Sequence, residues 1–507
     1  MALSDWAFLP VLLPLIGAAF AFLAKAFKGG RGGASNVLEY LGAFIGLGLP
    51  WLALAILFPV VWGGGSVHSI IGSWSRLVGI SYRFDGLAWL VDVLGFSVAG
   101  AAWIYSLGAG PKKPLFTAIF LIQTSALAAT AATSDIFNLF VCLEVLGMAS
   151  YVLVTMSEKP GAFLAAFSYL MVSAAAMVFF LIGVYGLYRL TGCLSYDDIA
   201  RSLALLPDSG GPVAVASIAS IASAIALRVA VMPLYGWLPD AHALAPHAVS
   251  AVLSGVLIKT PLFALSRFLL SMPGGGGAGQ LFGYAGAFTA LAGVLIALSQ
   301  KDAKRLLAYH SISQIGFVVC AWGAGVAALA RGEQRGYWLM GAAFMHAFYH
   351  ALFKSLLFLS VGTITDAAGN RDVYQLRNAG SLLVAAGEKV PLSAITYAVG
   401  ALSICAMPPF NGYGSKMALA FALKGTWEYL FLFAAGIGTI ASFIKLTGIF
   451  SKKLETHVAR NDQKPQPAEG KSYRISVPVQ TGQCVLASLC VGTGILSPWL
   501  YGYIVRL

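Results

Sequence analysis

Five ionisable residues lie inside long apolar stretches of this chain, where a charge is costly unless it has a function. Four are basic and one is acidic: Arg228, Lys259, Lys354, Lys416 and Glu144. Ionisable side chains at membrane depth are rare, and they commonly mark pathways for ions or protons. An acid and an amine placed together there ionise each other, and separating them changes the proton affinity of each. The set therefore predicts a chain that moves protons or other ions. A static ion pair that holds helices together is the alternative interpretation.

The segment MHAFYHALFKS places His346, His350 and Lys354 four residues apart. On a helix these side chains share one face over about 12 Å, and neighbours lie about 6 Å apart. One water molecule bridges that spacing, and histidine changes its charge near neutral pH. We therefore predict a proton relay. The alternative is two core histidines bonded to backbone and a lysine that reaches toward the surface. A metal site is not expected, because no third ligand-type residue shares the face.

The elements that position these residues are expected to be membrane-spanning helices. Hydrophobic residues make up 59% of the 507 and charged residues 10%, against about 25% charged in soluble domains. The apolar runs are continuous rather than alternating, which indicates an all-α integral membrane bundle and not a barrel. Runs of about 20 residues suffice to cross a bilayer. We predict fourteen spans, near 6–27, 38–62, 84–108, 115–133, 136–156, 162–188, 213–236, 245–271, 280–299, 305–328, 337–364, 392–422, 429–450 and 481–503.

The distribution of charge predicts how the chain is oriented. The net charge of +12 is spread over short loops, so it indicates membrane topology rather than nucleic-acid binding. Loops on one side carry 18 of the 32 Lys and Arg residues, and loops on the other side carry 9. The excess predicts that the first side faces the cytoplasm. We expect a multi-pass protein of the cell inner (cytoplasmic) membrane with both termini outside, and a first span that is retained as a helix.

Prolines interrupt two of the predicted spans. Pro233 with Pro239 lies in the seventh, and Pro408 with Pro409 lies in the twelfth, followed by Asn411 and Gly412. Proline removes a backbone donor and leaves carbonyl groups free at depth. Breaks in corresponding positions of two halves are typical of inverted-repeat transporters. The predicted organisation is therefore three N-terminal helices, a first five-helix repeat, a second five-helix repeat, a polar cytoplasmic linker and a last helix, over residues 1–114, 115–271, 280–450, 451–480 and 481–507.

No sequence pattern for a cofactor is present. The six cysteines are dispersed, with no pair spaced for zinc or an iron–sulfur cluster. The glycines at 274–277 follow no strand, so they indicate a connector and not a phosphate-binding loop. We therefore expect no cofactor and no metal in this chain, and no redox or nucleotide chemistry of its own.

Five segments together resemble the proton-translocating antiporter-like subunits shared by respiratory complex I, Mrp cation/proton antiporters and membrane-bound hydrogenases. They are DIFNLFVCLEVLGMASYVLV, PLYGWLPDAHALAPHAVSAVLSGVLIK, QKDAKRLLAYHSISQIGF, HAFYHALFKSLLF and ALSICAMPPFNGYGSK, and they cover about 135–450. The resemblance implies fourteen helices, two inverted five-helix repeats and broken helices seven and twelve. It also implies roles: Glu144 as the helix-five glutamate, Lys259 as the bridging helix-eight lysine, His346, His350 and Lys354 as the helix-eleven relay, and Lys416 as the terminal lysine of helix twelve.

Two positions depart from the family pattern. The family has a lysine five residues before the proline of helix seven, where this chain has Arg228. Arginine is not deprotonated in proteins, so Arg228 supplies a fixed charge that keeps Glu144 ionised but does not itself release a proton. A lysine before the tyrosine of helix six is replaced by Ser168 before Tyr169. The N-terminal half of the pathway is therefore expected to be altered or silent.

The resemblance implies an ion-translocating, non-redox membrane subunit of a multi-protein, redox-driven complex, with H⁺ or Na⁺ as the conducted ion. The motifs FNLFV-x2-E and PPFNGYGSK are closer to the Mrp and hydrogenase members than to subunits of the quinone-dependent enzyme. Expected partners are other membrane subunits, including similar antiporter-like ones, a peripheral redox module and lipids, and no nucleic acid. One alternative is a subunit of an Mrp-type Na⁺/H⁺ antiporter driven by the ion gradient alone. Another, suggested by Arg228, is a scaffold that conducts no protons.

Overall fold

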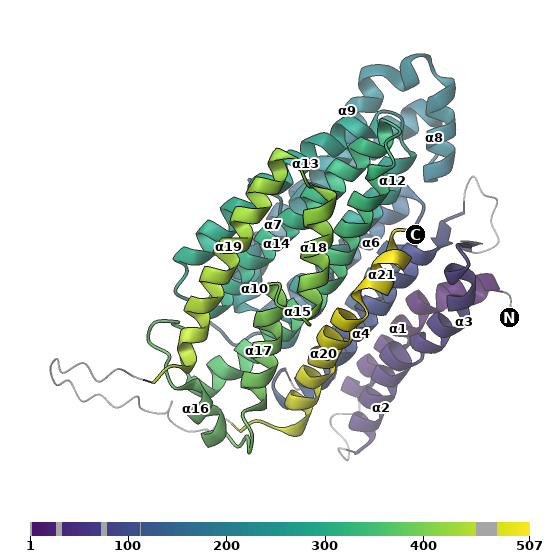
Figure 1. Ribbon diagram of the computed structural model, residues 1–507. Helices are drawn as coiled ribbons and strands as arrows, with labels where there is room; N and C mark the ends of the chain where they lie inside the picture. Colours follow the sequence, from purple (N-terminus) through teal and green to yellow (C-terminus); the bar gives the residue numbers. More distant parts are fainter. Residues whose placement is uncertain (1–2, 27–32, 72–78, 112, 453–473, 507) are drawn as a thin grey trace.

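The computed structural model describes residues 3–26, 33–71, 79–111, 113–452 and 474–506, and this part of the chain is a helical bundle (Figure 1). Twelve of its helices are long and apolar enough to cross a membrane, and the bent pair α20–α21 raises the number to thirteen. The spans without a proline break are α1 (Leu3–Ala26), α2 (Gly33–Ala43) continued by η2 (Phe44–Gly48) and α3 (Pro50–Trp62), α4 (Gly86–Gly108), α5 (Pro114–Ala132), α6 (Ile136–Thr155), α7 (Ala162–Thr191), α11 (His247–Val252) continued by η5 (Leu253–Leu257) and α12 (Thr260–Ser271), α13 (Gly275–Ser299), α14 (Ala303–Ala330), α15 (Arg335–Ala368) and α19 (Trp427–Thr447).

The remaining elements are shorter or bent. They are β1 (Val67–Ile70), β2 (Ser81–Phe84), α8 (Tyr196–Leu205), η4 (Pro207–Gly210), α9 (Gly211–Arg228), α10 (Leu238–Leu244), α16 (Ala379–Ala385), α17 (Leu392–Ile404), α18 (Asn411–Ala422), η6 (Gly448–Phe450), α20 (Val477–Ile495) and α21 (Ser497–Ile504). The strands pair antiparallel, with Val67 opposite Phe84. The predicted twelfth span is formed by α17 and α18, and α17 is only a short apolar helix. The predicted linker 451–480 lies mostly outside the described residues, and α20 already begins at Val477.

Three helices of the bundle begin at an aspartate. The side chains of Asp85, Asp135 and Asp302 accept hydrogen bonds from the backbone N–H three residues later, at 3.0, 2.7 and 2.9 Å. Such caps satisfy donors that a helix start leaves free. They fix where α4, α6 and α14 begin, and α6 and α14 carry residues of the site described below.

The two proline-containing breaks share one backbone geometry. After α9, Ala230 adopts a left-handed conformation (φ 56°), and after α17, Ala406 does the same (φ 60°). In each case this residue donates its N–H to the carbonyl three residues back, and the next residue donates to the carbonyl five residues back, at distances of 2.9–3.1 Å. This is the Schellman pattern of helix ends. The helices therefore stop before Pro233 and before Pro408.

Pro239 does not break a helix, contrary to the sequence prediction. It lies in the first turn of α10. A proline is tolerated there because its missing N–H has no helical partner in the first turn.

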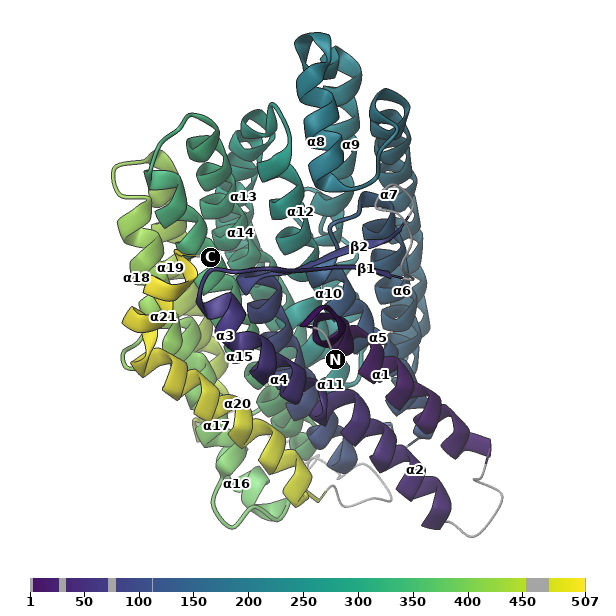
Figure 2. The ribbon, with the colours of Figure 1, turned by 90° about the vertical axis from the view of Figure 1, so that its right-hand side faces the viewer.

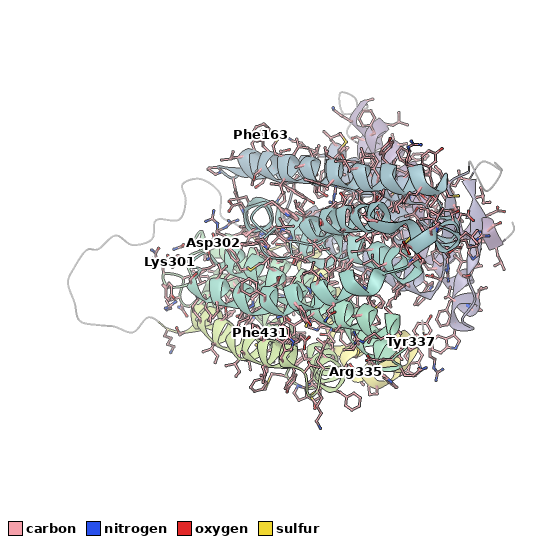
Figure 3. The ribbon with its side chains drawn as sticks, turned by 90° about the horizontal axis from the view of Figure 1, so that it is seen from above. Phe163, Lys301, Asp302, Arg335, Tyr337 and Phe431 are labelled. Carbon is pink, nitrogen blue, oxygen red and sulfur yellow. The ribbon has the colours of Figure 1, made fainter. Side chains whose placement is uncertain are left out.

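The loops gather at two opposite ends of the bundle. At one end, called the hairpin end here, β2 pairs with Thr133, and Asp135 pairs with Ser195. At the other, called the α16 end, the 300–302 loop pairs with the 369–378 loop through Asp302 and Asp372. Figures 1 and 2 show α16 at one end and α8 at the other, and Figure 3 shows Phe163, Lys301 and Asp302 far from Arg335 and Tyr337.

The centre of the bundle is made by α11–α12 and α15. Every residue in the most apolar stretch of each is buried, whereas only 39% of that stretch is buried in α7 and 33% in α19. Polar side chains on the central helices are therefore enclosed by protein rather than by lipid. That is the setting in which intramembrane ionisable groups are retained.

Candidate functional site

Glu144 and Arg228 form an ion pair between α6 and α9. One guanidinium nitrogen lies 2.9 Å from Glu144 Oε1, and another donates to the Leu143 carbonyl at 2.8 Å. Gly147, one turn further along α6, leaves room for the guanidinium, since a Cβ there would lie 3.1 Å from it. The Arg228 side chain is 4% exposed, whereas that of Glu144 is 35% exposed. The pair thus has a buried cation and an acid that reaches the lateral surface.

Lys259 lies at a distortion in the eighth span. The π-helical turn η5 shifts the backbone hydrogen bonds, so that Ile258 N–H donates to Leu253 O. The carbonyls of Ser254 and Gly255 instead accept from Lys259 Nζ at 2.6 and 2.5 Å. Short π turns are frequent at functional sites. Here the turn supplies a fully buried amine with two neutral acceptors from its own helix.

His346, His350 and Lys354 line one face of α15, and all three are fully buried. The two imidazole rings lie nearly parallel with centroids 6.2 Å apart. His346 Nδ1 is 2.9 Å from the Ser415 hydroxyl on α18, and Lys354 Nζ donates to the Leu307 carbonyl of α14 at 2.5 Å. Both ring nitrogens of His350 lack a hydrogen-bond partner within the described chain. On this face, the His350 imidazole therefore has free proton-binding positions, and it lies between His346 and Lys354, which are both hydrogen-bonded.

Lys416 lies just after the second helix break. Its Nζ donates to the Ile404 carbonyl at the end of α17, at 2.8 Å. The amine also lies 5.1 Å from the centre of the Phe317 ring, and the same ring lies 5.7 Å from His346. A cation at a helix C-terminus is stabilised by the free carbonyls and the helix dipole. Lys416 thus bridges the two halves of the broken helix and approaches the α15 histidines across one aromatic ring.

The structure brings four of the predicted residues close to a fifth, His350. His350 is within electrostatic range of Lys259, Lys354, His346 and Lys416. The Glu144–Arg228 pair is set apart, next to Tyr151 and Tyr169. Within the described residues, no hydrogen bond joins this pair to the lysine and histidine group.

The three lysines share a type of partner. Lys259, Lys354 and Lys416 all donate to backbone carbonyl oxygens, and within the described part of the chain none forms an ion pair with an acid. An amine keeps a hydrogen bond to a carbonyl in both its protonated and its neutral form. Each lysine can therefore lose and regain a proton while it keeps its hydrogen bond to the carbonyl oxygen.

Sequence reasoning missed two buried residues beside this group. Lys304 was counted as a loop residue, but its side chain is fully buried and donates to the Ala245 carbonyl and the Ser250 hydroxyl, both at 2.8 Å. His242 on α10 is also fully buried and donates from Nδ1 to Leu238 O at 2.9 Å. His242 lies within electrostatic range of Lys304, Lys354 and Lys259. A signal for Lys304 exists in the sequence: Lys304, Ser311 and Gln314 recur on one face of α14.

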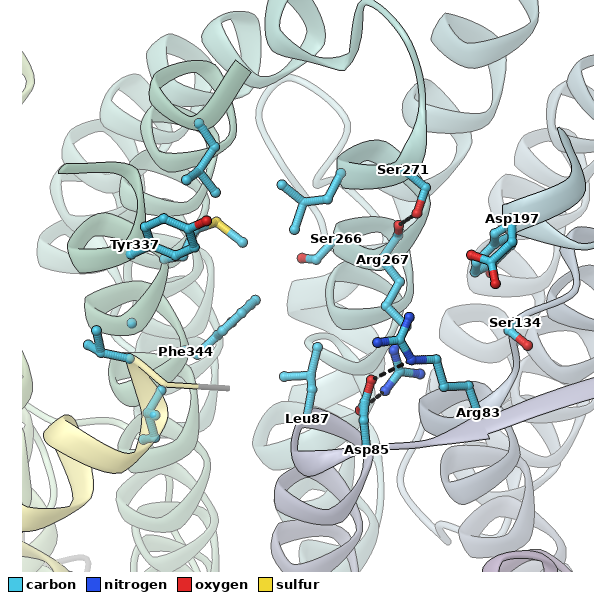
Figure 4. A pocket seen from close by; sticks show the side chains of 17 residues that line it. Arg83, Asp85, Leu87, Ser134, Asp197, Ser266, Arg267, Ser271, Tyr337 and Phe344 are labelled. Atoms are coloured by element: carbon cyan, nitrogen blue, oxygen red, sulfur yellow. Dashed lines mark hydrogen bonds and ion pairs between the residues drawn. The ribbon is translucent and has the colours of Figure 1, made fainter. Parts of the chain in front are cut away.

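A separate cavity of about 240 Å³ opens at the hairpin end (Figure 4). Asp85 accepts from Arg267 there and lies 3.4 Å from Arg83. Burial raises the pKa of Asp85, but Arg267, the Ala88 N–H and Arg83 outweigh it and hold the pKa below its usual value. Two turns further along α4, Asp92 is 2% exposed and neither of its oxygens has a partner in the described chain. Asp92 is thus a second acid at depth.

Comparisons with known proteins match this arrangement to one family. The sequence profile described as "NADH:quinone oxidoreductase/Mrp antiporter, TM" matches residues 133–445. NADH-quinone oxidoreductase subunit N of Desulforudis audaxviator is 30% identical over 444 residues, which are 85% of this chain and 84% of that protein. The D-type subunit of the Na(+)/H(+) antiporter of Alkalihalophilus pseudofirmus is 26% identical, over 88% of this chain and 86% of that protein. These two sequence identities do not show the expected closer likeness to the Mrp members.

A solved structure gives the same fold. A chain of the Mrp complex from Dietzia sp. DQ12-45-1b superposes with a TM-score of 0.84 at 23% identity, covering 100% of this chain and 97% of that one. At this identity the likeness concerns the fold. Both sequence relatives are named as subunits, and the structural neighbour is part of a complex.

Proposed function

Because this chain belongs to the NADH:quinone oxidoreductase/Mrp antiporter family of multi-pass membrane proteins, we propose that it translocates protons or sodium ions as a membrane subunit of a redox-driven complex. Protons are the ion that the site suits better, since its residues are amines and imidazoles. The observation that carries the proposal is the enclosed group of Lys259, His346, His350, Lys354 and Lys416, in which each lysine is held by carbonyl oxygens.

The proposed pathway runs through the middle of the bundle. A proton on Lys259 or Lys354 passes to His350, whose ring nitrogens have no partner to displace among the described residues. It moves on to His346, whose centroid is 6.2 Å away, and from there toward Lys416 past the Phe317 ring. The spacing between neighbours is spanned by water molecules. Each transfer leaves the donor neutral and the acceptor charged, so the arrival of a second charge nearby drives the first onward.

Glu144 and Arg228 have a different proposed role. Arg228 is permanently charged, so the pair is a fixed electrostatic element rather than a proton carrier. The conducting residues are then Lys259, the α15 residues and Lys416.

Partners are proposed from two charged side chains that reach the surface. Glu144 is 35% exposed on the lateral surface, and Lys416 is half-buried. Exposed charge in a span requires a partner, because lipid offers none. Side-by-side packing with similar membrane subunits provides one, in line with the complexes in which the relatives are named. A peripheral redox module supplies the drive, and lipids cover the remaining apolar faces.

The alternative is an Mrp-type Na⁺/H⁺ antiporter driven by the ion gradient alone. It is favoured by the 26% identity to a D-type antiporter component over 88% of this chain. The proteins that copurify with the chain separate the two. Iron–sulfur or nickel–iron subunits support the redox-driven complex, and small membrane subunits alone support the antiporter.

The experiment that tests the pathway measures ion transport by the complex in reconstituted vesicles. Lys416→Ala and Glu144→Gln each remove one charge with little loss of packing, so we expect transport to be abolished while the complex still assembles. Near-wild-type transport by both variants contradicts a mechanism based on these charges, and also leaves the non-conducting scaffold as the better interpretation.

A further inference from the structure

A cavity of about 700 Å³ opens at the α16 end, between residues 109–111 with Lys113, the 155–159 loop and the start of α11. Its polar lining includes Lys159, Glu158, Lys113, His247 and Asp366. In Figure 3, the labelled residues Phe163, Lys301 and Asp302 mark this end of the bundle. The cavity opens near the central helices, and none of the predicted site residues lines it.

One histidine–aspartate hydrogen bond lies at the inner side of this cavity. His247 Nε2 lies 2.9 Å from Asp366 Oδ2, which joins the first residue of α11 to the last turn of α15. The imidazole is nearly buried, at 6% exposed, whereas the carboxylate is 33% exposed. Both residues line the cavity, and Asp366 is the more exposed of the two. The ring packs on Gly362, where a Cβ would lie only 2.4 Å from Nδ1.

Lys304 lies next to the His247–Asp366 pair, further inside the protein. Its Nζ bonds the Ala245 carbonyl and the Ser250 hydroxyl, two residues before and three residues after His247. Lys304 is also within electrostatic range of Asp366, Lys159, Asp302 and Arg371. These are the charged groups that surround the pair, from α14, α15 and the loops at this end.

The next group inward is His242, which connects to the central lysines. The Ser250 hydroxyl donates to the His242 carbonyl at 2.7 Å. The His242 ring centroid lies 6.2 Å from that of Phe358, and Lys354 Nζ lies 5.4 Å from the same Phe358 ring. His242 Nε2 is buried without a partner in the described chain. A series of proton-binding groups, with Ser250 and the Phe358 ring between its members, thus leads from the cavity to Lys354.

We propose that this cavity is the mouth of the pathway at the α16 end, and that His247 and Asp366 carry protons between its water and Lys304. The proposal rests on the proposed function and names the route by which that pathway reaches solvent. The pair takes a proton from cavity water and gives it to the neutral amine of Lys304, and it then returns to its starting state. The number of protons on the His247–Asp366 pair is unchanged over the cycle, because one proton enters the pair and one leaves it.

Lys159 supports this assignment. Burial, and then Arg371, lower the pKa of Lys159 to about 8, while Asp366 and Asp302 act in the opposite direction. A lysine with that pKa exchanges protons near neutral pH. The opening therefore contains a group that equilibrates with solvent at the pH where the pathway must work.

Transport by the reconstituted complex tests the pair directly. We expect His247→Gln and Asp366→Asn each to lower the transport rate by about tenfold or more, within the range for loss of an acid–base group. Gly362→Ala should lower it too, because the methyl group displaces the imidazole without removing any titratable group. The matched controls are His68→Gln and Asp240→Asn, which change exposed residues outside the cavity.

A blocking experiment tests the mouth independently of folding. Ser157 lines the cavity, so Ser157→Cys, labelled with a bulky membrane-impermeant thiol reagent, should stop transport. Labelling should succeed only from the α16 side, and the parent chain treated in the same way should keep its rate. If the labelled variant and His247→Gln both transport normally while Lys354→Ala does not, the mouth is elsewhere and the proposed function stands. If Lys354→Ala also transports normally, the proposed function itself is wrong.

Discussion

At the scale of single residues, the central lysines differ from the pair at the edge of the site in the chemistry of their partners. Lys259, Lys354 and Lys416 bond neutral carbonyl oxygens, whereas Arg228 bonds a carboxylate. A carbonyl accepts from an amine in either protonation state, but a carboxylate holds the charge of its partner in place. This difference separates residues suited to carry protons from residues suited to supply a field.

The role of Arg228 can be tested by two substitutions. We expect Arg228→Lys to be tolerated in vesicle transport, since the positive charge beside Glu144 is retained. Arg228→Ala should impair transport and lower the thermal stability of the complex, because it leaves the carboxylate unpaired. The loss should be smaller than the roughly 3–5 kcal/mol of a fully buried pair, since Glu144 is 35% exposed. Normal transport and folding of Arg228→Ala would show that the pair has no role.

A second prediction for a single residue concerns His350 on α15. His350→Gln preserves side-chain volume but removes titration, so proton transport should fall steeply. The melting temperature should stay nearly unchanged, because neither ring nitrogen of His350 has a partner to lose within the described chain. His310→Gln is a useful comparison, since His310 is also fully buried and has no hydrogen-bond partner among the described residues, but lies on α14. A lower melting temperature with normal transport per folded complex would favour a packing role for His350.

At the scale of elements, the broken helices depend on close backbone approach. Gly412 opens α18 directly against the end of α17, and a Cβ on it would lie 1.7 Å from the Ser403 carbonyl oxygen. Gly412→Ala must therefore move one half-helix relative to the other, which shifts Lys416 from the Ile404 carbonyl. We expect transport to be lost and stability to fall by roughly 1–3 kcal/mol, as for other overpacked sites.

The matched control for Gly412 is Gly436→Ala in α19. A Cβ there meets nothing within 4 Å, so the change should leave transport intact and should stabilise the helix slightly, by about 0.5–1 kcal/mol. Transport and melting temperature of both variants give the comparison. If Gly412→Ala behaves like Gly436→Ala, the geometry of the break is not important for function.

Sequence patterns predicted the elements better than they predicted the contacts between them. Hydropathy located the spans because each must be apolar along its length, and the prolines marked where two of them are interrupted. Pro239 was misassigned because its effect depends on its position within a helix, which periodicity leaves open. The end of α9 depends on a left-handed alanine, Ala230, which has no distinctive sequence signal.

The contacts that define the site are mostly long-range. Counting loop charges placed Lys304 in solvent, yet α14 packs so that its amine enters the α10–α11 turn. His247 and Asp366 are 119 residues apart, and no local pattern indicates that they meet. Glu144 and Arg228 were expected to pair from a family resemblance, and the structure places them 2.9 Å apart.

At the scale of the whole molecule, the two ends of the bundle differ in their charged groups. The hairpin end has the Asp85, Arg83 and Arg267 cluster with Asp92 beneath it, and the α16 end has the His247–Asp366 cavity. The central lysines and histidines lie between them on enclosed helices. The arrangement fits a pathway that crosses the bundle and reaches solvent at both ends, with neighbouring subunits at the lateral faces.

The last prediction concerns which end faces the cytoplasm. Lys304 is buried, so the α16 end loses one of its counted loop charges, but it still carries the clear excess of Lys and Arg, and the positive-inside rule places it in the cytoplasm. Exposed lysines at each end make this measurable. Figure 3 labels Lys301 at the α16 end, and the Lys424 carbonyl accepts from Arg335 at the hairpin end, so the two test variants are Lys301→Cys and Lys424→Cys. In intact cells, an impermeant thiol reagent should label Lys424→Cys and not Lys301→Cys, and in inverted vesicles the pattern should reverse. The opposite pattern would put both termini in the cytoplasm, and the His247–Asp366 cavity would then open to the outside.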